Sequence, residues 1–127
     1  MIGSRKAFSS YSVDDIEAAR RFYQDTLGLE VTDTPMGFLD VHLNGGATVM
    51  LYAKPDHQVA SFTVLNFEVD DIDVTVDDLV ANGVVFERYD GAHQDDKGIA
   101  RGKAANMGPD IAWFADPAGN ILAVMGV

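Results

Sequence analysis

The chain contains no cysteine and no long apolar run, and each absence excludes a class of protein. Without cysteine there is no disulfide scaffold, thiolate zinc site or cysteine nucleophile, which fits a reducing compartment. No apolar stretch approaches the roughly 20 residues that a membrane-spanning helix needs. The first ten residues also lack the apolar core of a signal peptide. We therefore expect a cytoplasmic protein with no membrane partner.

Basic residues are also few. Nine Lys and Arg stand against 20 Asp and Glu, which gives a formal net charge of −11. A surface this acidic repels nucleic acid phosphates and anionic membranes, so we expect no nucleic-acid partner. The charge favours a cationic ligand or serves only solubility, and composition leaves both readings open. A chain of 127 residues with 47% hydrophobic residues fits one domain with its own core.

A short segment occurs twice in the chain. Val13-Asp14-Asp15-Ile16 recurs as Val69-Asp70-Asp71-Ile72, 56 residues later. An alternating apolar run precedes each copy, and a helical apolar pattern and then a glycine follow it. This predicts helices from Asp14, as N-cap, to Leu27 and from about Asp70 to Asn82. The aspartates on the other face of the second helix read as a solvated surface: Asp73, Asp77 and Asp78.

The remaining alternating runs predict four strands in each half, so each half reads strand, helix, strand, strand, strand. A three-residue turn at Asn44-Gly45-Gly46 sets His42 opposite Thr48 and Asp40 opposite Met50. The segment 91–109 is a long loop rich in glycine and charged residues, and loops of this length are usually mobile or functional. The predicted strands are 7–13, 29–33, 38–43 and 47–54, then 62–69, 84–89, 110–115 and 121–124.

These motifs together resemble the vicinal-oxygen-chelate superfamily, which comprises glyoxalases, bleomycin-resistance proteins and extradiol dioxygenases. The resemblance implies an α+β fold in which two βαβββ modules, here about 6–54 and 61–127 of a single domain, form a curved mixed-sheet cup with helices on the convex side. The motifs are Val13-Asp14-Asp15, Phe22-Tyr23 and Leu27-Gly28-Leu29 in the first module, and Phe67-Glu68-Val69-Asp70-Asp71 and 113–120 in the second.

Strand alternation predicts which side chains face the cup. His42 is a candidate general base or ligand partner, or a structural histidine on an edge strand. Trp113 is a candidate for stacking on an aromatic ligand, although core packing is the commoner role. We expect these residues to contact the ligand: Phe8, Ser10, Asp40, His42, Met50, Tyr52, Val64, Asn66, Glu68 and Ala123.

Enzymes of this superfamily hold a divalent metal with one residue from the first and one from the last strand of each module. By the resemblance, those positions fall on Phe8, Met50, Val64 and Ala123. None offers the imidazole nitrogen or carboxylate oxygen that such ions need. We therefore expect no metal and no other cofactor.

The sequence leaves several functions open. The first is a metal-independent protein that binds a small molecule, for example to sequester a cationic or aromatic compound, as in the drug-binding branch that the chain resembles. The alternative is a lyase or isomerase that uses His42, Asp40 or Glu68 as acid or base. A scaffold with an unused cup is a third reading. Exposed sheet edges also lead us to expect a homodimer.

Overall fold

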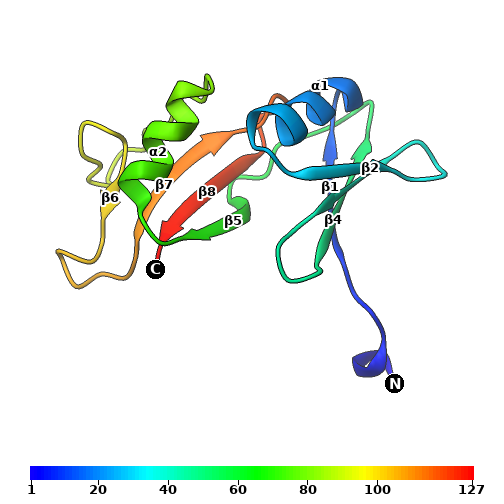
Figure 1. The fold of residues 1–127 in the computed structure, drawn as a ribbon, viewed down its shortest axis with the longest axis horizontal. Helices are drawn as coiled ribbons and strands as arrows, with labels where there is room; N and C mark the ends of the chain where they lie inside the picture. The colour runs from blue at the N-terminus through cyan, green and yellow to red at the C-terminus, as the bar shows by residue number, and fades with distance from the viewer. The chain divides into compact units, whose positions relative to one another are not determined.

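The structure, a computed structural model, describes residues 1–127, and the chain divides into two compact units, Met1–Gln58 and Val59–Val127. Each unit consists of one four-stranded sheet with one helical segment against it (Figure 1). No helix is both long and apolar enough to cross a membrane. The predicted α+β class is confirmed.

In the first unit, the first and last strands lie side by side and parallel, and the two strands between them complete the sheet. The order is β1-β4-β3-β2, with β1 and β4 parallel and the other neighbours antiparallel. The elements are η1 (Ile2–Ser4), β1 (Ser9–Val13), α1 (Ile16–Arg21), η2 (Phe22–Thr26), β2 (Glu30–Asp33), β3 (Leu39–His42) and β4 (Thr48–Ala53).

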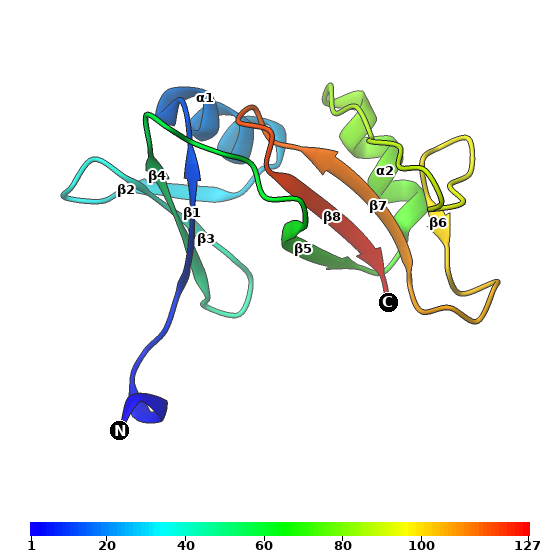
Figure 2. The same cartoon turned by 180° about the vertical axis from the view of Figure 1, so that it is seen from behind.

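The second unit repeats this topology in the order β5-β8-β7-β6, with β5 and β8 parallel. Figure 2 shows β8 between β5 and β7. The repeated sequence segment therefore corresponds to a repeated strand–helix connection. The elements are β5 (Thr63–Val69), α2 (Ile72–Ala81), β6 (Ala100–Arg101), β7 (Asp110–Ala115) and β8 (Ile121–Gly126).

One predicted strand does not form. Residues 84–89 form no ladder with β7: the backbone pairing consists of an isolated bridge between Phe86 and Phe114 and a 2.8 Å bond from Glu87 N to Trp113 O. In a regular antiparallel ladder the next N–H to donate to β7 would be that of Tyr89, but it bonds to the Gln94 side chain instead. The prediction of a strand here was wrong. The two-residue β6, from within the predicted loop 91–109, pairs with β7 at the sheet edge.

The helix boundaries also differ from the prediction. Asp15, not Asp14, caps α1, and its Oδ1 accepts bonds from Glu17 N and Ala18 N at 3.1 Å. Asp71 does the same for α2 through Val74 N. In each repeated segment the second aspartate has the extended backbone that a cap requires. At its other end, α1 continues into the π-helical turn η2, which precedes Gly28.

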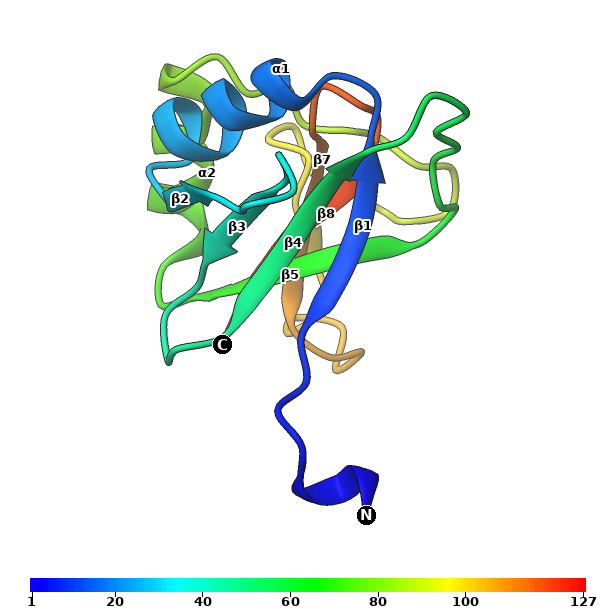
Figure 3. The same ribbon diagram turned by 90° about the vertical axis from the view of Figure 1, so that its right-hand side faces the viewer.

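The core of each unit lies between the helix and one face of its sheet. α1 contacts β4 on this side of the first sheet (Figure 3), and α2 contacts β7 and β8 in the second unit. We call the opposite surface of each sheet the open face. The buried residues of β3, β4 and β7 alternate along each strand, whereas in β8 Ala123, predicted to face the cup, is buried between Leu122 and Val124. The alternating buried residues are Leu39, Val41, Val49 and Leu51 in the first unit, and Ala112 and Phe114 in the second.

The cap of α1 gives a paired test of the helix boundary. Asp15→Ala removes the acceptor for two backbone donors, so we expect it to lower the free energy of unfolding by about 1 kcal/mol. Asp14→Ala removes the adjacent carboxylate without touching those bonds, and we expect a much smaller loss. Urea unfolding of both variants measures the difference. Equal losses would contradict the cap assignment.

Candidate functional site

On the open face of the first unit, three predicted site residues lie in one cross-strand row. Ser10 pairs with Met50, and Met50 pairs with Asp40 on its other side. The hairpin register predicted for Asp40 and Met50 is confirmed, as is that of His42 opposite Thr48. His42 is not isolated on this face, because its Nε2 shares a 2.8 Å hydrogen bond with Thr32 Oγ1.

The other first-unit site residues lie near the ends of β1 and β4. The Tyr52 ring stands edge-on to Phe38, with centroids 6.1 Å apart. Beside Tyr52 in register, Ser12 Oγ shares a 2.6 Å hydrogen bond with His57 Nδ1, a pair that the sequence reasoning missed. Phe8 precedes the first residue of β1 and is 60% exposed.

On the open face of the second unit, Asn66 pairs with Ala123, and Ala123 pairs with Trp113. Asn66 is exposed, whereas Ala123 is fully buried. Glu68 pairs with Met125 and is also exposed. The structure thus brings Asn66 and Ala123 into one row with Trp113, and it places Glu68 in the next row along the strand.

A β-bulge changes the predicted position of Val64. Thr63 pairs with Ile121 and Leu65 with Leu122, so Val64 is the extra residue between them. Directly paired residues share a face of the sheet. Thr63 therefore lies on the open face with Ile121, and the alternation that placed Val64 there does not extend across the bulge. Bulges commonly redirect a side chain next to a site.

Beside the bulge, the open face of the second unit contains a hollow of about 240 Å³. Tyr89 and Trp113 form an edge-to-face pair there, with ring centroids 5.5 Å apart and planes at 73°. Burial raises the pKa of the Tyr89 phenol, and the charge of Glu87 raises it further. The hollow is lined by Ser61, Thr63, Tyr89, Trp113 and Ile121.

Sequence reasoning weighed Trp113 mainly as a core residue and did not select Tyr89. The available signal for Trp113 was alternation, because its buried neighbours Ala112 and Phe114 place it on the other face. Tyr89 carried no such signal. Its position depends on a loop that leaves β7 after Glu87, and strand periodicity does not describe that loop.

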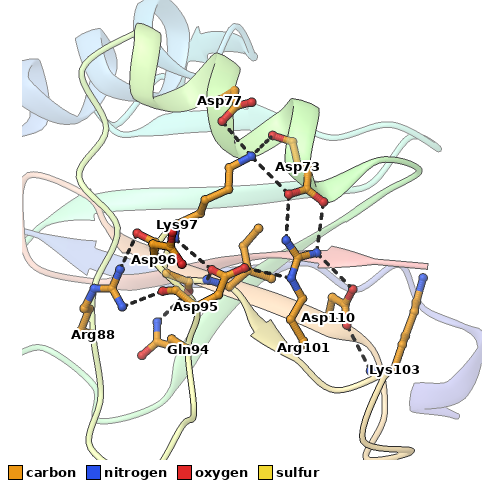
Figure 4. Close-up of polar contacts among 12 residues, drawn as sticks. Asp73, Asp77, Arg88, Gln94, Asp95, Asp96, Lys97, Arg101, Lys103 and Asp110 are labelled. Carbon is orange, nitrogen blue, oxygen red and sulfur yellow. Dashed lines mark hydrogen bonds and ion pairs between the residues drawn. The ribbon is translucent and has the colours of Figure 1, made fainter.

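The helix side of the second unit carries an ion-pair network between α2 and the long loop (Figure 4). Asp73 accepts bonds from Arg101 at 2.8 and 3.1 Å and from Lys97 at 3.2 Å. Lys97 also pairs with Asp77 at 3.0 Å, and Arg101 pairs with Asp95 at 3.0 Å. Asp77 and Asp78 are exposed and Asp73 is half-exposed, as expected for a solvated face, but the ion pairs with Lys97 and Arg101 were not predicted.

The sequence model of the glyoxalase/bleomycin resistance protein/dioxygenase superfamily matches residues 8–124. The chain belongs to this superfamily. A comparison with curated proteins gives no match, whereas solved structures of this fold are numerous.

Three solved structures illustrate the likeness to other proteins. TnmS3, an antibiotic binding protein from Streptomyces sp. CB03234, is 25% identical with a TM-score of 0.66, and the match covers 97% of each chain. The integron cassette protein HFX_CASS4, from the mobile metagenome of Halifax Harbour Sewage Outfall, is 21% identical with a TM-score of 0.68 over 97% of this chain and 100% of that one. A glyoxalase family protein from Enterococcus faecalis is 20% identical with a TM-score of 0.63, over 98% and 99% of the two chains.

The residues that the resemblance assigns to the superfamily's metal positions do not carry the side chains that bind a divalent metal ion. Ser10 pairs with Met50 and Asn66 with Ala123, so Met50 and Ala123 occupy equivalent places in the two sheets. Neither carries an imidazole or a carboxylate, and neither do Phe8 and Val64. Thr63, which takes the open-face position at the bulge, has only a hydroxyl. No group of three or more His, Asp or Glu residues is arranged to hold a metal ion.

The ion-pair network predicts a defined acid response. Arg101, followed by Lys97, lowers the pKa of Asp73 from 3.8 to about 2. A carboxylate with a depressed pKa stabilises the fold above its unfolded value and loses this effect as the pH falls. We expect the stability advantage of the wild type over Asp73→Asn to be full above pH 3.8 and to vanish near pH 2.

Thermal melts of the wild type and Asp73→Asn across this pH range measure that advantage. Asp78→Asn, on the same helix but outside the network, is the matched control and is expected to change the melting temperature less at neutral pH. A wild-type advantage that stays constant down to pH 2 would contradict the assigned role of Asp73.

Proposed function

We propose that this superfamily member binds a planar aromatic small molecule without a metal ion, and that its role is to hold the compound rather than to transform it. The observation that carries the proposal is the hollow bounded by Tyr89 and Trp113 on the open face of the second unit. Indole and phenol rings whose planes meet at 73° offer one face and one edge, and a flat ring packs well against such a corner.

The charge of the chain favours a cationic compound. A net charge of −11 raises the local concentration of cations near the protein. The face of an indole ring is the side chain surface that attracts a cation most strongly. Glu68 and Asn66, exposed on the same open face as Trp113, add a carboxylate and an amide. Thr63 and Ser61 contribute hydroxyls to the hollow, which suits the few polar contacts that orient a ligand.

Two further observations support this function. The positions that the resemblance assigns to the metal carry Phe8, Met50, Val64 (or Thr63, at the bulge) and Ala123, none of them a typical metal ligand, and a protein that only sequesters a compound needs no metal. One solved structure of this fold, TnmS3, is an antibiotic binding protein. A homodimer is part of the proposal, because exposed sheet edges tend to pair.

The chain has a single tryptophan, so its fluorescence reports on the hollow directly. We expect 9-aminoacridine, a planar aromatic cation, to quench Trp113 emission saturably. Acridine, which has the same ring system but is neutral at pH 7.5, should bind about fivefold to tenfold more weakly, because it lacks the cation–π attraction.

Titration calorimetry of 9-aminoacridine into two variants tests whether the compound binds in the hollow. We expect Trp113→Ala to weaken 9-aminoacridine binding by about tenfold or more, the size of one lost ring contact. The control is Met107→Ala, which truncates another large side chain of the same unit, 81% exposed and outside the hollow. Equal affinity of Trp113→Ala and the wild type would refute the proposed site.

Metal independence is a separate prediction. We expect protein purified without chelator to contain less than stoichiometric Ni, Zn, Mn or Fe, and EDTA to leave the affinity for 9-aminoacridine unchanged. Elemental analysis and native mass spectrometry of one sample measure this directly. One metal ion per chain, or loss of binding in EDTA, would exclude the metal-independent function.

A further inference from the structure

The Gln94 side chain connects three backbone groups around the segment that carries Tyr89. Its Oε1 accepts a 2.8 Å bond from Tyr89 N, and its Nε2 donates to Glu87 O at 2.8 Å and to Gly98 O at 2.7 Å. The amide thus bonds to the backbone on both sides of Arg88 and joins that segment to Gly98, within the loop 91–109.

The bonds from Gln94 take the place of the strand pairing that residues 84–89 lack. The chain stays bonded to β7 as far as Glu87, whose N–H donates to Trp113 O. The next donor of the same ladder would be Tyr89 N–H, and Gln94 takes it instead of a neighbouring strand. The position of the Tyr89 ring against Trp113 therefore depends on a side chain, not on sheet pairing.

Gln94 is itself held in place by the loop. It forms a bridge with Ala100, beside the fully buried Ile99. The Arg88 guanidinium donates to Asp95 O and Asp96 O at 2.7 Å each. Asp95 Oδ1 accepts from Ile99 N at 2.9 Å. Because the amide is anchored from both sides, it can transmit the conformation of the loop to Tyr89.

We propose that Gln94 is the positioning residue of the aromatic corner, and that it holds the Tyr89 ring against Trp113. Its effect on a ligand rests on the function proposed above, whereas its effect on the two rings does not. Removing the amide takes this partner from the Glu87 and Gly98 carbonyls and from the Tyr89 N–H. The loss favours a different backbone path for residues 87–89.

The first experiment needs no ligand. Gln94→Met keeps the length of the side chain but removes all three bonds. We expect it to raise the acrylamide quenching constant of Trp113 about twofold, as the Tyr89 edge moves away, and to weaken the aromatic near-UV circular dichroism. Gln24→Met, an exposed glutamine of the first unit, is the matched control and should leave both signals unchanged.

A double-mutant cycle separates positioning from general loosening of the loop. In a Tyr89→Ala background, Gln94→Met should produce no further rise in Trp113 quenching. With 9-aminoacridine as the probe, Gln94→Met should weaken binding about fivefold in the wild type and not at all in Tyr89→Ala. Effects of equal size in both backgrounds would overturn the inference.

Gln94→Glu is the second variant, and it decides the question if Gln94→Met does not fold. It keeps an oxygen for Tyr89 N but sets a second carboxylate oxygen against the Glu87 and Gly98 carbonyl oxygens, so a rise in Trp113 quenching at least as large is expected. Wild-type quenching and circular dichroism in the folded Gln94 variants would overturn the inference. If these signals change as expected but the wild type binds no 9-aminoacridine, the positioning role stands and the proposed ligand class fails.

Discussion

The parallel pairing of the first and last strand in each unit is the constraint on which the other features depend. It requires the chain to cross from one strand to its partner through a helix and two further strands, and it confines the helix to one face of the sheet. The opposite face is then free for side chains that are not needed in the core. This pairing also sets Ser10 beside Met50 and Asn66 beside Ala123, so the same register that builds the fold determines which residues meet on the open face.

Much of this arrangement was predictable from the sequence, because it follows from local patterns. The repeated Val-Asp-Asp-Ile segment marked both strand–helix connections, and the alternation of apolar residues identified the buried faces. The turn at Asn44-Gly45-Gly46 fixed the register of Asp40 against Met50, as the structure confirms. Periodicity works here because side chains of a regular strand must alternate between core and surface.

The features that escaped prediction do not follow from regular strand alternation. The choice of Asp15 over Asp14 as cap is a matter of one residue's backbone angles. The bulge at Val64 reverses the alternation within a single strand. Tyr89 reaches Trp113 because the backbone of 84–89 leaves β7 and bonds to Gln94. The bulge and the path of 84–89 are determined by tertiary contacts between segments, which a one-dimensional pattern does not contain.

The bulge in β5 has a consequence for how this fold varies. An extra residue in one strand lets the side chains before it change faces, while those after it keep their register with β8. Leu65 can thus keep its place opposite Leu122. If the bulge moves along the strand, a different residue comes to lie opposite Ile121. A lineage can in this way present a different side chain to the hollow by insertion or deletion of a residue before Leu65, with no substitution in the core. The residue of β5 that lines the hollow can therefore change independently of the residues that pack the core.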